Sequence, residues 1–514
     1  MKQLTMLDAS FLYKESKRTP QNATMIWVYD RSTARGAPPT YEDIHHHITS
    51  RAHQIPVFRK RIMHVPGDID LPWWVDDPNF NPDEHVHHVT LPPPGDWRQL
   101  REFVGRVHSR CVDLSRPVWE IHVVDGLDDV EGIPSGAFAL VMVCHHAAMD
   151  GRTSVIVNET LNSTERARQR TPVPAYAGPE EQPDGWELFS RGGRNIISQP
   201  ARSLKAIGKL APYLASSVRD SSSPDSDLPP VPETRFSGRV SSRMDWDAVY
   251  FPLDEVKAVR KALPGATLND VAIAVFAGAM REYLSGHGEL PEAPLRSMFP
   301  MALPPTEDSH EPGNELAITV VNMGTDIADT LERVKVICAS TRAAKESMKN
   351  YGLQISHHVQ EAIPGMLIGP VTRLSSKKFD SSSTACNTAV SNVVGPAKAQ
   401  YLDGCKLVRI ASAVFTPDGQ GLINYMTSYT DQAHFGYTCC ARMMPDPDRY
   451  TDCIRESFHD LCLRTGVRKV AKKKPAAKKK PAVKKKPAVK KKPAAKKKPA
   501  VKKKPAKRSV RKKS

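Results

Sequence analysis

Two adjacent histidines followed by an acid and a glycine are the residues of this sequence best suited to chemistry. They form the motif HHAAMDG at His145–Gly151, directly after the apolar run AFALVMVC. A neutral imidazole, whose unperturbed pKa is ~6.5, can take the proton of an alcohol while the alcohol oxygen attacks a thioester carbonyl. This chemistry needs no acyl-enzyme. We expect the carboxylate of Asp150 to hold the loop, by a hydrogen bond or by pairing with an arginine, and not to act as a second base.

The same histidines also have interpretations without a catalytic role. Side chains alternate along a strand, so at most one of His145 and His146 faces a given cavity while the other packs in the core. A metal site built from these two and Asp150 is disfavoured, because neighbouring strand residues diverge and no matching Cys/His cluster follows. The remaining histidine groups are interpreted as solvated loops or helix faces; they are His45–His47, His85, His87 and His88.

A buried strand must deliver the motif. The run Ala137–Cys144 is apolar on both faces and predicts such a strand, with the histidines at its carboxyl end. Asp150 and Gly151 then predict a tight turn before a helix. Elsewhere in this part of the chain the pattern predicts further elements: strands at 24–29 and 119–124, and a helix at 40–51.

Composition changes between about Glu165 and Arg243, where Pro, Ser, Gly and charged residues dominate and predict a long linker or crossover. Ordered patterning resumes after it. Thr267 with Asp270 three residues on resembles a capping box that opens a helix, and Gly286 suits the end of that helix. Other expected elements are helices at 253–263 and 448–463, and strands at 316–322, 406–414, 421–429 and 434–438.

These segments predict two α/β halves, since 514 residues exceed the roughly 250–300 that one core usually supports. We expect a first subdomain with the histidine motif at 1–164, a linker at 165–243, a second subdomain at 244–465 and a tail at 466–514. From 472 to 506 the tail repeats KKKPAA or KKKPAV. Its regular prolines and lack of large apolar residues predict an extended, disordered segment.

The formal net charge of +17 does not describe the whole chain. The tail from Arg468 holds 25 of the 73 Lys and Arg residues and no acid, which leaves 48 basic against 56 acidic residues elsewhere. The body is therefore mildly acidic, and only the tail is expected to bind polyanions, whether anionic lipid or, without sequence preference, nucleic acid.

Nine scattered cysteines without a CxxC motif, and a first segment that mixes acids into its apolar residues, predict a reduced cytoplasmic protein without a signal peptide. The longest apolar run falls far short of the ~20 residues of a membrane-spanning helix. If the protein acts on lipid, we expect it to do so peripherally, at the inner membrane or on lipid droplets.

Several motifs in one order resemble the bacterial wax ester synthase/acyl-CoA:diacylglycerol acyltransferase family, within the wider group of HHxxxDG acyltransferases. The resemblance runs from residue 6 to about 465. Besides the histidine motif, it rests on MLDASFLY at Met6–Tyr13, SRPVWEIHVVDGL at Ser115–Leu127, LNDVAIAV at Leu268–Val275, LRSMFPMALP at Leu295–Pro304, GNELAI at Gly313–Ile318, VSNVVGP at Val390–Pro396 and GQGLINYMTSYTDQAHFGYT at Gly419–Thr438.

The resemblance implies two chloramphenicol-acetyltransferase-like subdomains with a tunnel between them. It implies that His146 is the general base, His145 a supporting residue, and Asp150 and Gly151 loop-structuring residues. Asn269 and Asp270 are weaker candidates for substrate binding, since a structural role such as capping a helix is the favoured interpretation of both.

The implied reaction esterifies diacylglycerol or a long-chain alcohol with long-chain acyl-CoA as a substrate, without a cofactor or metal. Two departures from the family pattern, Arg152 after the motif and Val394 in place of the usual proline, concern the choice of substrate more than the reaction. One alternative is a catalytically weak or inactive accessory protein that tethers lipid bodies or membrane to DNA through its tail. Another keeps the enzyme but takes the acyl group from an acyl carrier protein in place of CoA.

Overall fold

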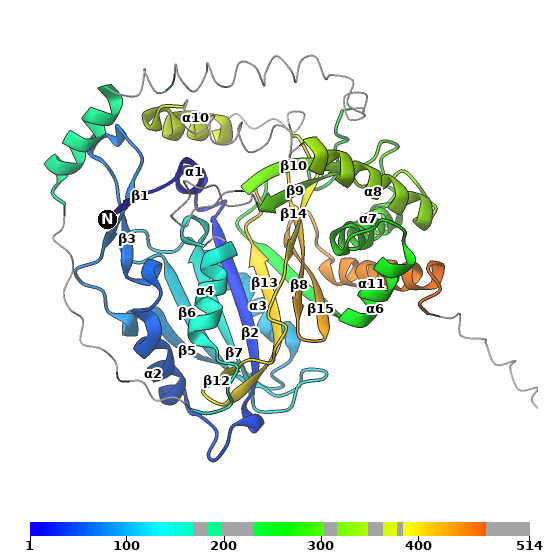
Figure 1. Ribbon diagram of the computed structural model, residues 1–514, viewed down its shortest axis with the longest axis horizontal. Coiled ribbons are helices and arrows are strands. Elements are labelled where there is room, and N and C mark those ends of the chain that lie inside the picture. The colour runs from blue at the N-terminus through cyan, green and yellow to red at the C-terminus, as the bar shows by residue number, and fades with distance from the viewer. Residues whose placement is uncertain are drawn as a thin grey trace, which may run out of the picture. The chain divides into compact units, whose positions relative to one another are not determined.

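Two six-stranded sheets and a small three-stranded sheet form the framework of the protein (Figure 1). The structure is a computed structural model that describes residues 1–149, 151–168, 172, 183–197, 203, 230–302, 316–347, 363–377 and 384–468. Each large sheet is packed into its own hydrophobic core. The expected mixed α/β fold with two sheet-rich halves is confirmed.

The first sheet carries the histidine motif at the end of a central strand. Its order is β12-β13-β2-β7-β6-β5, and all neighbours are antiparallel except β5 and β6. All nine residues of β7 are buried, as predicted for a strand that is apolar on both faces. The strands are β2 (Asn22–Asp30), β5 (Val86–Thr90), β6 (Trp119–Leu127), β7 (Ala137–His145), β12 (Tyr401–Leu402) and β13 (Cys405–Val414).

The second sheet has the order β10-β9-β11-β14-β15-β8, and β11 runs parallel to both of its neighbours. Its strands are β8 (Met244–Pro252), β9 (Arg296–Ala302), β10 (Leu316–Asn322), β11 (Thr388–Val393), β14 (Leu422–Tyr429) and β15 (Gln432–Cys440). The small sheet is antiparallel and contains β1 (Lys2–Gln3), β3 (Lys60–Met63) and β4 (Trp73–Asp76).

Helices cover the sheets. They are α1 (Met6–Lys14), α2 (Tyr41–Ala52), α3 (Trp97–His108), α4 (Gly151–Leu161), α6 (Leu253–Ala262), α7 (Leu268–Gly286), α8 (Thr330–Ser347), α10 (Gly365–Lys377) and α11 (Pro447–Arg464). The short 3-10 helices are η1 (Arg31–Thr33), η2 (Pro56–Arg59), η3 (Pro66–Asp68), η4 (Pro82–His85) and η5 (His146–Ala148). The predicted capping box of α7 is confirmed, because Thr267 and Asp270 each accept a hydrogen bond from the other's backbone N–H.

Strand β13 comes from the second half of the chain but lies in the first sheet. It pairs with β2 from Lys406 opposite Asp30 to Val414 opposite Ala23. The expectation that residues 244–465 form a half of their own is therefore wrong for β12 and β13, because a sheet edge accepts any strand that reaches it, whatever its distance in sequence. The boundary near residue 244 stays a prediction.

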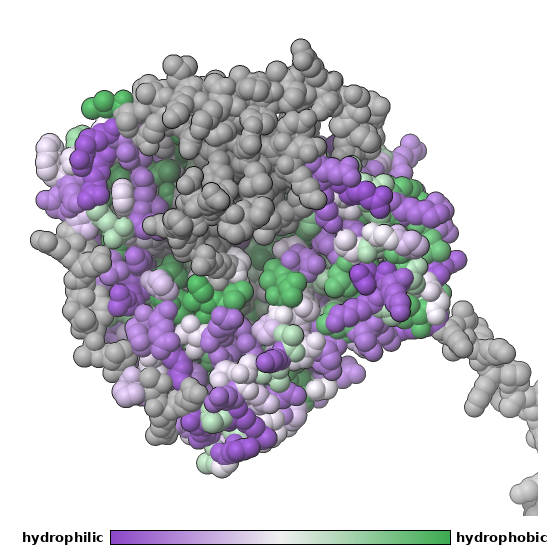
Figure 2. All heavy atoms as spheres, in the orientation of Figure 1, coloured by the Kyte–Doolittle hydropathy of each residue, from purple (hydrophilic) through white to green (hydrophobic). Residues whose placement is uncertain are grey.

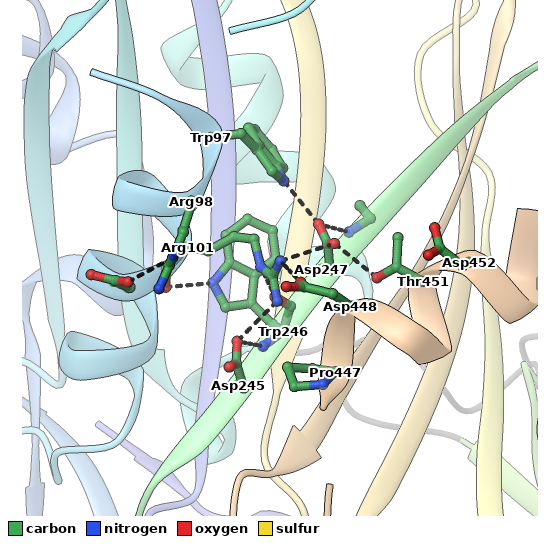
Figure 3. Close-up of polar contacts among 12 residues, drawn as sticks. Trp97, Arg98, Arg101, Asp245, Trp246, Asp247, Pro447, Asp448, Thr451 and Asp452 are labelled. Atoms are coloured by element: carbon green, nitrogen blue, oxygen red, sulfur yellow. Dashed lines mark hydrogen bonds and ion pairs between the residues drawn. The ribbon is translucent and has the colours of Figure 1, made fainter. Parts of the chain in front are cut away.

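A second contact between the halves surrounds Arg101 of α3 (Figure 3). Its guanidinium lies 2.5 Å from the carboxylate of Asp448 in α11 and 3.3 Å from that of Asp247 in β8. The indole N–H of Trp97 also donates to Asp247, at 2.8 Å. Burial disfavours the charge of Arg101, but the surrounding carboxylates outweigh it and raise the pKa of the guanidinium. In this contact Arg101 and Asp247 are largely buried, at 11% and 7% exposure, while Asp448 reaches the pair from the solvent side with an exposure of 81%.

The segment predicted as a linker or crossover, residues 165–243, contains a helix that the sequence pattern did not predict. Residues 185–197 form a helix, in which Leu188 is buried and the Asn195 amide donates to the carboxylate of Asp70 at 2.6 Å. The Pro- and Ser-rich composition on both sides concealed its apolar positions. The predicted disordered tail from residue 469 onward lies outside the described residues. Among the described helices, none combines the length and apolar character needed to cross a membrane.

Candidate active site

Backbone hydrogen bonds fix both histidines of the motif at the end of β7. The His145 N–H donates to the Val118 carbonyl at 2.9 Å, and the His146 N–H donates to the Gln21 carbonyl at 2.7 Å. The chain then forms η5 and enters α4 at Gly151. The predicted delivery of the histidines by a buried strand is therefore confirmed. Asp150, the expected loop-structuring acid, lies outside the described residues.

His145 is a core residue. Its side chain is fully buried, and Nδ1 accepts a hydrogen bond from the Ala147 N–H at 3.1 Å. In the neutral ring the proton therefore sits on Nε2, which lies 3.6 Å from a carboxylate oxygen of Glu15. Burial, and then the neighbouring His146, lower the pKa of His145 to about 3. This histidine supports the turn and is closed to substrate.

His146 is only half-buried, and aromatic rings contact its imidazole. The Phe11 ring of α1 lies 4.4 Å away between centroids, and the Phe415 ring, directly after β13, lies 5.1 Å away in an edge-to-face arrangement. The two phenylalanines also contact each other at 5.5 Å. One comes from the first residues of the chain and the other from its second half, so both parts of the protein shape the surroundings of His146.

Glu15 links α1 to the histidine motif. Its backbone N–H caps the helix at the carbonyls of Phe11 and Leu12, and its side chain is only 8% exposed. The carboxylate accepts a hydrogen bond from the Gln21 N–H at 3.3 Å, while the Gln21 carbonyl accepts the His146 N–H. The Gln21 backbone therefore connects Glu15 to His146, in addition to the contact of Glu15 with His145. Burial raises the pKa of Glu15, against the lowering effect of its hydrogen bonds with the Gln21 N–H and the Cys111 side chain.

The loop-structuring role expected for Gly151 gains no steric support. A Cβ added at this glycine would meet no atom within 4 Å, and its φ is outside the left-handed region. The space beside the start of α4 is therefore open. Of the two departures from the family pattern, the Arg152 side chain lies outside the described residues, and Val394 is 81% exposed.

Asn269 and Asp270 separate into two kinds of residue. Asp270 caps α7 and accepts a hydrogen bond from the Thr341 hydroxyl of α8 at 2.7 Å, so its role is structural. Asn269 is 8% exposed, and among the described residues its amide has no hydrogen-bond partner. A buried amide without a partner is costly. Asn269 therefore stays a candidate for substrate binding. The described contacts of Asp270 are with residues in the second half of the chain.

The interpretation of the other histidines as solvated residues is wrong for His47 and His85. The His47 ring donates to the Leu161 carbonyl at 2.9 Å, and burial, then the charge of Arg51, lower its pKa to about 4. His85 lies against the Trp119 ring at 4.5 Å between centroids. Both are core residues, because apolar neighbours from distant segments cover them. The other side chains of this set, at His45, His46, His87 and His88, are partly exposed.

Sequence reasoning missed Glu15, Gln21 and Phe415 as neighbours of the motif. Phe11 lies in a motif that carried the family resemblance, but nothing in the local pattern connects it to a histidine in β7. No group of three or more His, Cys, Asp or Glu side chains in the described segments is arranged to hold a metal ion. The site can therefore offer an imidazole on an apolar aromatic surface, backed by a buried carboxylate.

Two protein-family models match the chain. One describes the wax ester synthase/diacylglycerol acyltransferase catalytic domain and matches residues 4–272, and the other describes the C-terminal domain of the same proteins and matches residues 312–462. A putative diacylglycerol O-acyltransferase of Mycobacterium tuberculosis is 31% identical over 454 residues, which cover 84% of this chain and 91% of the relative. Another from the same organism is 28% identical over 89% of this chain and 99% of the relative.

Solved structures share the fold. A wax ester synthase/diacylglycerol acyltransferase from Marinobacter aquaeolei VT8 matches with a TM-score of 0.63 at 23% identity, covering 90% of this chain and 100% of that one. The starter condensation domain of rhizomide synthetase matches with a TM-score of 0.52 at 12% identity, covering 90% and 94%. The fold of the described sheets is therefore that of the condensation-domain type of acyltransferase.

Proposed function

Because the chain belongs to the wax ester synthase/diacylglycerol acyltransferase family, we propose that His146 is the general base with which it transfers a fatty acyl group from CoA to an alcohol. The enzyme is an acyltransferase of this acyl-CoA-dependent type. The observation that carries the proposal is the setting of His146: a half-buried imidazole held at a strand end by its own backbone N–H, with Phe11 and Phe415 against its ring.

The proposed reaction needs one base and no covalent intermediate on the protein. The alcohol oxygen attacks the thioester carbonyl carbon while His146 takes the hydroxyl proton. The tetrahedral intermediate then collapses, the carbon–sulfur bond breaks, and the CoA sulfur receives the proton from the imidazolium. Ester and free CoA are the products. The apolar rings beside the imidazole keep water from competing with the alcohol as the acceptor.

The substrates are a long-chain acyl-CoA and either diacylglycerol or a long-chain alcohol. The names of the mycobacterial relatives support diacylglycerol, and the name of the family adds wax esters. Both acceptors are largely apolar, and we propose that they reach His146 along the tunnel between the two halves that the family resemblance implies. Acyl-CoA is a substrate, and the proposed mechanism needs no cofactor.

Purified protein supplied with a mixture of acyl-CoAs, diacylglycerol and long-chain alcohols tests the proposal by mass spectrometry of the esters formed. CoA release should require an acceptor. His146→Ala should stay folded and lose ~10²- to 10⁴-fold in turnover, as for a missing general base. His145→Ala should lose less turnover but more thermal stability, because it removes a buried structural ring. Isolation of a stable acyl-enzyme, or equal losses in both variants, would exclude the mechanism.

Two helices that expose large apolar side chains support a peripheral position of the enzyme on an anionic lipid surface. In the helix at 185–197, Trp186 is 74% exposed and Ile197 is 82% exposed. Figure 2 shows hydrophobic side chains at the upper-left edge of the view, at the tip of this helix. In α10 the exposed apolar residues are Met366, Leu367, Val371 and Leu374. Tryptophan and large aliphatic side chains suit the boundary between headgroups and acyl chains.

The two helices flank the same loop. Asn195 of the first donates to Asp70, and a Cβ added at Gly365 of α10 would lie 2.7 Å from the same carboxylate. The exposed Arg194 and the half-exposed Arg373 supply positive charge for anionic headgroups beside the apolar residues. Because α10 packs on α1, which carries Phe11, the lipid surface meets the enzyme next to the site.

Vesicle flotation at high salt tests this surface, since salt suppresses attraction by charge but not apolar insertion. Trp186→Ser combined with Leu374→Ser should release the full-length protein from anionic vesicles that contain diacylglycerol. Val394→Ser removes an equally exposed apolar residue outside the two helices and should leave flotation unchanged. Unchanged flotation of the double variant would place the lipid contact elsewhere.

A further inference from the structure

Three segments that are distant in sequence meet at the ion pair between Arg18 and Asp418. Arg18 follows α1, and its two terminal nitrogens donate to the two carboxylate oxygens of Asp418 at 2.6 and 2.7 Å. Arg18 also donates to the Val240 carbonyl at 3.0 Å, while the Val240 N–H donates to Asp418 at 2.9 Å. Each member of the pair therefore binds the other and the end of the linker. The two-pronged geometry is the strongest arrangement of this kind of pair.

Asp418 lies in the loop that carries Phe415 to the proposed base. The last bond of this loop with the first sheet is from the Phe415 N–H to the Asn22 carbonyl, at 3.0 Å. Beyond that point the chain leaves the sheet, and the Gly419 N–H donates to the Gly238 carbonyl at 3.0 Å. The loop is therefore held by sheet pairing on one side of Phe415 and by the Asp418 contacts on the other.

We propose that Arg18 and Asp418 are positioning residues that hold the Phe415 ring against His146. The described hydrogen bonds of the pair join it to Val240 and not to the imidazole, so it acts through the loop. The Asp418 side chain is 11% exposed, which limits competition by water for the guanidinium. This inference rests on the proposed role of His146 as the base, and it assigns a catalytic consequence to an ion pair that joins the first residues of the chain to its second half.

A double-mutant cycle measures the effect of the pair on turnover. Asp418→Asn and Arg18→Met should each lower kcat by about 10- to 100-fold, the scale of loss from a small misplacement at a reacting centre, with a smaller change in KM for acyl-CoA. The kcat of the double variant should be no lower than that of the less active single variant, because both changes break the same interaction. Arg18→Lys keeps the charge without the two-pronged contact and should fall between the wild type and Arg18→Met.

A matched control is Asp125→Asn, which breaks the ion pair between Arg31 and Asp125 at the opposite end of β2. Its turnover should equal that of the wild type. Because a general loss of stability would also lower turnover, melting temperatures are measured for every variant and assays are run well below them.

The reactivity of His146 toward diethylpyrocarbonate, followed by peptide mass spectrometry, gives a readout that does not depend on turnover. Loosening of the Phe415 loop should increase carbethoxylation of His146 several-fold in Asp418→Asn and not in Asp125→Asn. Wild-type reactivity together with wild-type kcat in folded Asp418→Asn would overturn the inference, as would additive losses in the double variant. Absence of turnover in the wild type would instead contradict the proposed function, while the reactivity still tests the loop.

Discussion

The carboxylate of Glu15 contacts the histidine motif by two routes, through the ring of His145 and through the Gln21 peptide. Neither route reaches the imidazole of His146 directly. The buried His145 and Glu15 fix the backbone of the motif. The half-buried His146 keeps a ring that can contact substrate.

Replacement of Glu15 by alanine should therefore damage both fold and turnover. The Gln21 N–H would lose its acceptor in a buried setting, at a cost of about 1–3 kcal/mol of unfolding free energy. We expect a lower melting temperature and a lower kcat, measured by calorimetry and by CoA release. Glu15→Gln retains an oxygen acceptor and should keep most of the stability. Ala in place of the exposed Glu131 serves as the control, and a Glu15→Ala protein with unchanged kcat would contradict the linkage.

The contacts of Phe415 and Glu15 with the histidine motif could not be predicted from the sequence. The HHAAMDG motif identifies the residue type and the strand that carries it, because both depend on a short stretch of the chain. A ring contact between Phe415 and His146 depends instead on the pairing of β13 with β2, which joins a distant part of the chain to the first sheet. Asp270 illustrates the reverse case, since its capping role could be predicted from Thr267 three residues before it.

At the scale of elements, the expected helices and strands overlap the observed ones almost throughout, because apolar periodicity and capping residues are local signals. The pattern of β13 predicted a strand but not its partner. Pairing with β2 could not be predicted, since alternation of apolar residues fixes which face is buried and not which sheet receives the strand. The helix at 185–197 was missed because the composition around it is typical of linkers.

Close approach of two strands explains a glycine in the VSNVVGP motif. A Cβ added at Gly395, after β11, would lie 2.0 Å from the backbone carbonyl oxygen of Ser428 in β14. Because backbone cannot move aside as a side chain can, Gly395→Ala should lower the free energy of unfolding by about 1–3 kcal/mol. Chemical denaturation measures the loss. Gly286→Ala is the matched control, since a Cβ there meets no atom within 4 Å, and it should be neutral or stabilising.

At the scale of the whole molecule, four buried histidines make the free energy of unfolding depend on pH. Burial is the main cause that lowers the pKa of His47, His108 and His434 to about 4 each, and that of His145 to about 3. Each stays neutral in the folded protein, while the unfolded chain takes up protons below its ordinary pKa of ~6.5. Their contribution is therefore present above pH 6.5 and is lost as the pH falls toward 4.

The melting temperature should accordingly fall steeply between about pH 6.5 and pH 4, with each neutral histidine contributing up to ~1.4 kcal/mol per pH unit. Differential scanning fluorimetry across this range measures the slope. His108→Asn should make the slope shallower, because one proton-binding difference between folded and unfolded states disappears. A slope identical to that of the wild type would contradict the assignment for this residue.

The tail should bind polyanions without taking part in turnover, since its 25 Lys and Arg residues are accompanied by no acid. A truncation that ends near Gly466 should keep its turnover on dispersed substrate. It should lose DNA binding at low salt and the salt-sensitive share of vesicle binding, where each basic residue near the surface contributes ~1 kcal/mol. Filter binding should show no sequence preference and a steep dependence on salt. Loss of turnover on dispersed substrate would contradict the separation of body and tail.

The placement of β13 also bears on the order in which the chain is made. A ribosome releases the histidine motif long before residues 405–414, so during synthesis β2 stands at an open edge of the first sheet although most of its residues are buried in the finished protein. Such an edge invites pairing with other chains. The amino-terminal half should therefore be neither a minimal enzyme nor a stable fragment, and nascent chains that stall before β13 should depend on chaperones to stay out of aggregates.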